Sequence, residues 1–388
     1  MGESAPGTGR AAAARQWPSW WRWGWPLLLL GLAAAVPLLA WLGWSAISNS
    51  SDGTEVGAPA DPAASGYEAF VEPTPSLLLI HANGDRLHGV ALLVLTDPGV
   101  EGAVLLLSTE TMTSTGRISD RWASSATAGM VDSVAELLGV RPGETQVVGD
   151  EGWAALAAAA APVAVSSPVP LLGADGEILF GAEAQLAAAD VGPYLAGRSP
   201  GESPLVGLSR QVSFWQAWLW QVGESTEPDV IPGETDRGMG RFARSLVAGQ
   251  FLVVAVGGEA ADSGEVVLAP LDTAFLVSEV VPFRRSASEA GVPRVRLLNG
   301  VGDPELTKAA ARELSRAGAR ITRIGNAAEF GWETTKLAYH DPGFAPYAEA
   351  YRDALGAGSV AAEELLEPEV DITVTFGADF SPLSAGDG

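Results

Sequence analysis

The chain has 388 residues, with 47 acidic against 23 basic side chains and a formal net charge of −24. So acidic a chain excludes nucleic acid held by a basic surface, and the absence of cysteine excludes disulfides, thiolate catalysis and cysteine-bound zinc. The 47% share of apolar residues excludes a largely disordered chain, and the length predicts about two to three folded units.

The first predicted element is a transmembrane helix over residues 26–47, a run that contains no charged residue. At about 1.5 Å per residue this helix is about 33 Å long, enough to cross the apolar core of a bilayer. Tryptophans stand at both ends of the run, as in the aromatic belts of membrane helices. The alternative is a cleaved signal peptide, which is less well supported because its apolar part is usually only about 7–15 residues long.

Charges on either side of this helix predict its orientation. Arg10, Arg15 and Arg22 precede it and acidic residues follow it, so the positive-inside rule makes residues 1–25 a cytoplasmic tail. We therefore expect a single-pass protein of the cell membrane whose bulk is extracytoplasmic. Residues 48–75 are rich in Gly, Ala, Ser, Pro and acids and contain no base, a composition that predicts an acidic flexible linker.

The first predicted element outside the membrane is a β-hairpin over residues 76–96. Two apolar runs flank Asn83 and Gly84, and Asn-Gly is the strongest short hairpin signal because both central residues of a type I′ turn need positive φ. The sequence therefore predicts a two-residue turn at these positions.

The register of this hairpin decides how two of the three histidines lie. With a turn at Asn-Gly, His81 faces Arg86 and Leu79 faces His88, so both histidines lie on one side of the ribbon. A metal site there would need a third ligand, and Asp85 falls on the other side. We therefore expect no metal site and interpret both as ordinary histidines of a sheet.

The next elements alternate between strands and helices. Strands are predicted at 103–107 and 163–165, and helices at 130–138 and 151–161. A helix opened by Arg210 carries Phe214, Trp215 and Trp218 on one broad face. Core packing is the favoured interpretation of that face, and a lipid-binding pocket lined by these three residues is the alternative.

Between residues 77 and 250 the order of several short phrases resembles the LytR-CpsA-Psr family of bacterial envelope phosphotransferases. The phrases are Leu107-Ser108, Ala135 to Val140, Gly152-Trp153, Ala161 to Val165, Tyr194 to Arg198 and Arg210-Gln211. The resemblance implies a mixed α/β domain over residues 76–290. It also implies transfer of a glycopolymer from undecaprenyl pyrophosphate to peptidoglycan, with arginines and Asp-held Mg²⁺ neutralising the departing pyrophosphate.

Several positions depart from the pattern of that family. Thr111 and Met112 replace an expected Arg and Asp, His88 stands at a metal-ligand position, and Ala196 replaces the partner of Arg198. The arginines that remain, Arg86, Arg198 and Arg210, are the catalytic candidates if the chain is an enzyme. Too few carboxylates remain to hold Mg²⁺. The departures therefore imply a degenerate, non-catalytic domain with no cofactor, and Mg²⁺ is expected only if the chain is a transferase.

A second, small α+β domain is predicted for residues 293–388. A strand at 294–298 ends in the turn Asn299 to Gly302, and Asp303 can cap the helix that follows. The remaining pattern completes a β-α-β-β-α-β order with a last strand in 370–379. This region resembles the LytR C-terminal domain, and we expect it to fold on its own.

Three functions fit these observations. The favoured one is a membrane-anchored envelope protein that binds peptidoglycan, a polyprenyl-linked glycan or another envelope protein without catalysis. The first alternative is a phosphotransferase that attaches glycopolymers to peptidoglycan. The second is a regulator, although the chain shows no element that reads DNA. Convergence of the three candidate arginines on one pocket is the feature that separates binding from transfer.

The predicted orientation is testable in cells. A tag fused after Gly388 should be digested by protease added to intact spheroplasts, because the positive-inside rule places that end outside. A cytoplasmic marker protein in the same cells should stay intact. A protected tag would show that the orientation inferred from the amino-terminal arginines is wrong.

Overall fold

The computed structural model describes residues 59–225, 230–285, 292–364 and 369–381. The predicted cytoplasmic tail and transmembrane helix lie outside these residues, as does the part of the predicted linker before residue 59. Within the described residues, no helix has both the length and the apolar character needed to cross a membrane.

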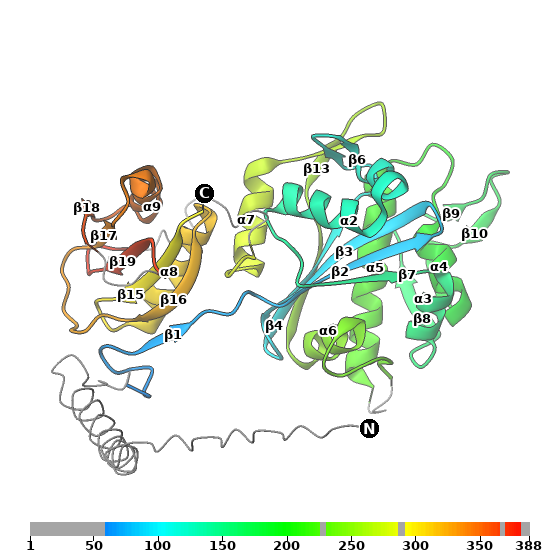
Figure 1. Ribbon diagram of the computed structural model, residues 1–388. Coiled ribbons are helices and arrows are strands. Elements are labelled where there is room, and N and C mark those ends of the chain that lie inside the picture. Colours follow the sequence, from blue (N-terminus) through cyan, green and yellow to red (C-terminus); the bar gives the residue numbers. More distant parts are fainter. Residues whose placement is uncertain (1–58, 226–229, 286–291, 365–368, 382–388) are drawn as a thin grey trace, which may run out of the picture. The chain divides into compact units, whose positions relative to one another are not determined.

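The larger described domain contains a five-stranded sheet with the strand order β12-β4-β3-β2-β7 (Figure 1). Its strands are β2 (Ser76–Asn83), β3 (Arg86–Asp97), β4 (Glu101–Leu107), β7 (Glu144–Val148) and β12 (Gln250–Ala255). Strand β3 is antiparallel to both of its neighbours, β2 and β4, and the two outer strands pair in parallel with their neighbours. The mixed pairing matches the mixed α/β domain expected from the sequence.

Helices cover both faces of this sheet, and alternate residues along each strand enter different cores. Leu77 and Leu79 pack with one set of helices, whereas Leu78 and Ile80 pack with the other. The first set is α3 (Asp150–Ala157), α4 (Ala188–Ala196), α5 (Pro204–Glu224) and α6 (Gly238–Ala248). The second is α2 (Ile118–Leu138) and α7 (Pro270–Val280). Burial on both faces explains why the central strands are almost entirely apolar.

Short strands lie outside this sheet and pair in twos. The pairs are β5 (Met112–Thr113) with β6 (Gly116–Arg117), β8 (Val163–Ser166) with β11 (Glu183–Leu186), β9 (Leu171–Leu172) with β10 (Ile178–Phe180), and β13 (Gly258–Ala260) with β14 (Val266–Leu268).

The hairpin of β2 and β3 forms as predicted, but its register differs. Asn83 pairs with Arg86, so Gly84 and Asp85 are the central turn residues. Gly84 has φ of 59° and Asp85 is not among the residues with positive φ, which suits a turn with glycine at its first central position. A bulge then places His81 opposite Gly89. The predicted pairs of His81 with Arg86 and of Leu79 with His88 are therefore wrong.

The carboxyl-terminal domain contains a six-stranded sheet with the order β1-β16-β15-β19-β17-β18. Its elements are β15 (Arg294–Asn299), α8 (Pro304–Arg316), β16 (Arg320–Asn326), β17 (Lys336–Tyr339), the 3₁₀ helix η1 (Pro342–Phe344), α9 (Ala345–Leu355), β18 (Ser359–Ala362) and β19 (Ile372–Phe376). The predicted elements are present, and β18 adds a strand between the second helix and the last predicted strand. Apolar residues of α8 and α9 pack on the sheet to form its core.

The edge strand β1 (Glu68–Phe70) comes from the region predicted to be a flexible linker. It pairs antiparallel with β16, and Figure 1 shows the chain passing from β1 directly towards β2. The Glu68 carboxylate forms ion pairs with Arg296 and Arg323. The described part of the linker thus differs from the expected tether, because backbone pairing and two guanidinium groups hold it on the sheet.

Replacing Glu68 tests how firmly β1 is held. Glu68→Gln leaves Arg296 and Arg323 without this carboxylate in a site where all three side chains are at most one quarter exposed. We expect a loss of about 1–2 kcal/mol of unfolding free energy, measured by urea denaturation. The matched control is Glu305→Gln in the exposed pair with Lys308, which should change stability by less than about 0.5 kcal/mol. Equal effects of the two substitutions would contradict a stabilising role for β1.

Candidate functional site

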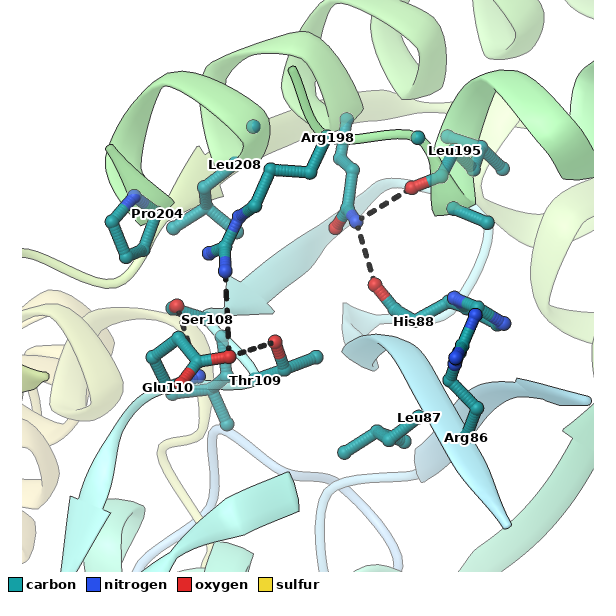
Figure 2. Close-up of a pocket in the computed structure, with 15 residues that line it drawn as sticks. Arg86, Leu87, His88, Ser108, Thr109, Glu110, Leu195, Arg198, Pro204 and Leu208 are labelled. Atoms are coloured by element: carbon teal, nitrogen blue, oxygen red, sulfur yellow. Dashed lines mark hydrogen bonds and ion pairs between the residues drawn. The ribbon is translucent and has the colours of Figure 1, made fainter. Parts of the chain in front are cut away.

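A polar pocket of about 380 Å³ lies at the ends of the central strands, where β3 begins and β4 stops. The α4–α5 connection and the first turns of α5 supply its other wall (Figure 2). Its polar lining residues are Arg86, His88, Ser108, Thr109, Glu110, Arg198 and Gln211. Because the strand interiors are apolar and buried on both faces, polar groups gather where the strands end.

The turn after β4 presents Glu110 to the pocket. Ser108 Oγ accepts a hydrogen bond from the Glu110 backbone N–H at 3.2 Å, and Thr109 Oγ1 donates to Glu110 Oε1 at 3.4 Å. These contacts fix Glu110 just after the end of β4, where the Glu110 side chain is 17% exposed. Glu110 is therefore a positioned charge and not a mobile surface group.

Two arginines share this carboxylate. Arg198 Nη1 lies 3.5 Å from Glu110 Oε1, and Arg117 Nη1 lies 3.3 Å from Oε2 (Figure 2 shows the contact of Arg198). Arg117 also contacts Glu265 at 3.2 Å. The positive charge of Arg198 is thus already compensated before any ligand binds, which weakens its pull on an incoming anion.

The three candidate arginines do not converge. Arg86 and Arg198 line the pocket, but Arg210 does not. Arg210 is 1% exposed, forms an ion pair with the buried carboxylate of Glu202, and donates to the backbone oxygen of Gly197 at 3.0 Å. Its charge is neutralised inside the protein, where it ties α5 to the segment that carries Arg198.

Arg86 is the other candidate that lines the pocket, and it is exposed. It supplies most of the positive charge in the pocket that no carboxylate compensates. Figure 2 shows it beside His88, apart from the pair of Arg198 and Glu110.

Gln211 is a pocket residue that the sequence did not single out. Its Nε2 donates to the backbone oxygens of His88 and Leu195 at 3.1 and 3.2 Å, so it joins β3, α4 and α5. The signal in the sequence was its place directly after Arg210, in a phrase quoted only for family resemblance. Gln211 holds the two walls of the pocket together.

The buried His81 lies next to His88, a half-buried residue of the pocket lining. The rings of His81 and His88 lie 5.1 Å apart, and His81 Nε2 contacts Asp150 Oδ1 at 3.0 Å. His81 Nδ1 is buried without a partner, so the neutral ring donates from Nε2 to Asp150. Burial lowers the pKa of His81 below its usual range, against the opposing effect of the hydrogen bond to Asp150. Burial also lowers the pKa of His88.

The pKa of Asp150 is lowered, although burial alone would raise it. Burial acts to raise the pKa of this carboxyl, but hydrogen bonds with Asn83 and His81 hold it below its usual range overall. Asp150 is thus ionised while the two histidines are neutral near pH 7.

The pocket does not fit the Mg²⁺ that the family resemblance implies. Across the residues that the structure describes, no three His, Asp or Glu side chains are grouped so that they could hold a metal ion. Glu110 is the carboxylate that lines the pocket, and two guanidinium groups already occupy its oxygens.

The aromatic face of α5 is packed in the core. Phe214, Trp215 and Trp218 are at most 2% exposed, and Trp153 contacts two of them edge to face. The cavity that reaches Trp215 measures only about 20 Å³. Core packing, the favoured interpretation of this face, agrees with this arrangement, and a lipid-binding role for these residues stays a prediction.

Comparisons with known proteins address both domains. Residues 293–380 match the family model described as LytR cell envelope-related transcriptional attenuator. These residues therefore form a LytR C-terminal domain, as the sequence predicted. No curated protein matches the chain.

Solved structures similar to this chain include a LytR-Csp2A-Psr enzyme from Actinomyces oris, at 15% identity over 55% of this chain and 94% of that chain, with a TM-score of 0.43. A transcriptional regulator from Enterococcus faecalis is 15% identical over 54% of this chain and 86% of its own, with a TM-score of 0.42. TagT from B. subtilis is 13% identical over 58% of this chain and 94% of its own, with a TM-score of 0.40. The name of the first structure contains the name of the family that residues 77–250 resemble.

The buried His81 predicts a pH dependence of stability. His81 binds a proton less readily in the folded chain than at its ordinary pKa of 6.5, so the unfolded chain is protonated first as the pH falls. Stability from this group is complete above about pH 6.5 and declines as the pH falls towards the lowered pKa. His81→Gln should flatten this decline in the free energy of unfolding between about pH 5 and 6.5.

The matched control is His340→Gln, which removes an exposed histidine of the other domain and should leave the decline unchanged. An identical pH profile for wild type and His81→Gln would contradict the buried neutral histidine.

Proposed function

We propose that this protein is a membrane-anchored, extracytoplasmic cell-envelope protein of the LytR-CpsA-Psr type that binds a phosphate-bearing glycopolymer of the cell wall without turning it over. The observation that carries the proposal is the ion pairing of two candidate arginines, one in the pocket and one beside it. Arg198 pairs with Glu110 and Arg210 pairs with Glu202, so carboxylates of the protein already compensate the charge of two of the three candidate arginines.

Transfer chemistry needs more than the pocket offers. A departing pyrophosphate has to be neutralised by fixed cations, commonly with a metal ion bridging its oxygens. Arg86 is exposed, Arg198 is compensated, and Arg210 lies outside the pocket. With no fitting metal site among the described residues, the pocket is better suited to binding than to catalysis.

The lining suits a polar, anionic ligand. Hydroxyl groups of Ser108 and Thr109, the amide of Gln211 and the charge of Arg86 surround a volume of about 380 Å³, large enough for a sugar phosphate unit. A polyprenyl chain is less well supported, because the cavity beside Trp215 is about 20 Å³ and its walls are packed aromatic rings. The polymer is therefore the proposed ligand in preference to its lipid carrier.

The rest of the chain supports an envelope location. The carboxyl-terminal domain belongs to a family described by its relation to the cell envelope. The charge-free run 26–47 supplies the proposed anchor, with residues 1–25 in the cytoplasm. A net charge of −24 disfavours nucleic acid as a ligand, which leaves wall polymers and other envelope proteins as partners.

Binding can be tested by substitutions with opposite expected signs. In titrations of the full chain with a phosphate-bearing wall glycopolymer, Arg198→Gln should weaken binding about tenfold, since one charge-assisted hydrogen bond is lost. Glu110→Gln should strengthen binding by a similar factor, because it removes the carboxylate that competes for Arg198 while Arg117 keeps Glu265.

Arg312→Gln is the matched control, since Arg312 is exposed on α8 and does not line the pocket. It should leave the affinity unchanged, and a polymer stripped of its phosphate groups should bind weakly to every variant. Loss of binding in Glu110→Gln, or equal binding by all variants, would contradict the proposed site.

A further inference from the structure

A second pocket, separate from the first, is lined by three arginines. It measures about 250 Å³ and shares no lining residue with the polar pocket at the strand ends. Arg284 and Arg285 follow α7, and Arg320 begins β16. None of the residues that line it is acidic, although acids outnumber bases by 47 to 23 in the chain as a whole. The lining of this pocket is therefore basic, in contrast to the chain as a whole.

Backbone hydrogen bonds between distant segments fix the walls of this arginine pocket. Val71 N–H donates to Thr322 O at 3.0 Å, and Arg141 N–H donates to Arg285 O at 2.8 Å. Thr74 and Phe283 exchange two further bonds, from Thr74 N–H to Phe283 O at 2.8 Å and from Phe283 N–H to Thr74 Oγ1 at 3.0 Å. The cavity is therefore formed in advance, which lowers the ordering cost of binding.

Arg284 has buried donor groups that a ligand could satisfy. Its Nε and Nη2 atoms are buried and have no hydrogen-bond partner. Burial lowers the pKa of this guanidinium, with no carboxylate opposing the effect. Buried guanidinium N–H groups without an acceptor are rare in folded proteins, because their lost hydration is not replaced.

The structural alternative is that the end of α2 satisfies Arg284. A Cβ built on Gly139, which caps that helix, would lie 3.6 Å from Arg284 Nη1, so the negative end of the helix dipole is close. This contact concerns Nη1 and leaves Nε and Nη2 unpaired. It also does not involve Arg285, which lines the same cavity.

We infer that the arginine pocket binds a phosphate group, as the free ion or as a phosphate ester. Guanidinium groups donate in a planar fork that matches phosphate oxygens, and a phosphate carries enough charge and acceptor atoms for more than one arginine. A carboxylate carries one charge and two acceptor oxygens, fewer than a phosphate, so it fits a three-arginine lining less well. Glu72, next to the lining residues Val71 and Pro73, is exposed and does not line the pocket.

The test is thermal unfolding of the full chain, solubilised in a neutral detergent, at constant ionic strength. Inorganic phosphate should raise the melting temperature in a saturable manner, whereas chloride and acetate should not, because a ligand that binds the folded state stabilises it. Glycerol phosphate separates the two sources of the group. An equal shift identifies an ester site, and a shift with inorganic phosphate alone identifies a site for the free ion.

Arg284→Gln and Arg285→Gln should each weaken the apparent affinity for phosphate at least tenfold. Without phosphate, Arg284→Gln should melt at or above the wild-type temperature, since it removes two N–H donor groups that are buried without an acceptor. The exposed Arg285→Gln variant keeps the test valid if Arg284→Gln does not fold, and Arg312→Gln should respond to phosphate as wild type does. The inference is overturned if acetate acts as strongly as phosphate, if phosphate has no effect, or if both variants retain the full response.

Discussion

The central sheet of the larger domain is buried on both faces, and this constraint decides where chemistry can occur. Leu77 to Ile80 point alternately into two cores, each covered by its own helices. A polar side chain along such strands is costly unless it finds a partner, as His81 does in Asp150. The functional groups are therefore confined to the strand ends, where His88, Ser108 and Glu110 meet the α4–α5 connection.

Charge pairing separates the two pockets. At the strand ends two of the three candidate arginines are paired within the protein, Arg198 in the pocket with Glu110 and Arg210 beside the pocket with Glu202. In the arginine pocket, Arg284 has no such partner. The first arrangement suits reversible contact with a polymer whose sugars and phosphates are both recognised. The second suits one strongly charged group, since the ligand has to provide the missing negative charge.

Much of the fold could be predicted because its signals are local. The apolar runs of β2 to β4 and the cap of α8 at Asp303 depend on neighbouring residues, and they lie where expected. Strand β1 was missed because three residues within an acidic, Pro-rich stretch carry little pattern of their own, and their stability comes from β16 and two distant arginines. The hairpin register was misjudged because the bulge near His88 depends on tertiary contacts.

The candidate site was predicted in part for the same reason. Family resemblance pointed to Arg86, Arg198 and Arg210, but not to the burial of Arg210 with Glu202, because that pair depends on the path of the α4–α5 connection. Gln211 became visible only when its two backbone acceptors were brought together by the fold. The arginine pocket joins segments around residues 71, 284 and 320, and no spacing in the sequence could indicate it.

The central claim, that the pocket binds without catalysis, is tested most directly by a turnover measurement. The full chain is mixed with a glycopolymer linked to undecaprenyl pyrophosphate, peptidoglycan and Mg²⁺ or Mn²⁺, and release of the lipid product is followed at enzyme excess. We expect release no faster than in the absence of protein, because Arg198 and Arg210 are already paired with carboxylates. Release that is abolished by Arg198→Gln but unchanged in Arg312→Gln would contradict the account and identify the chain as a transferase.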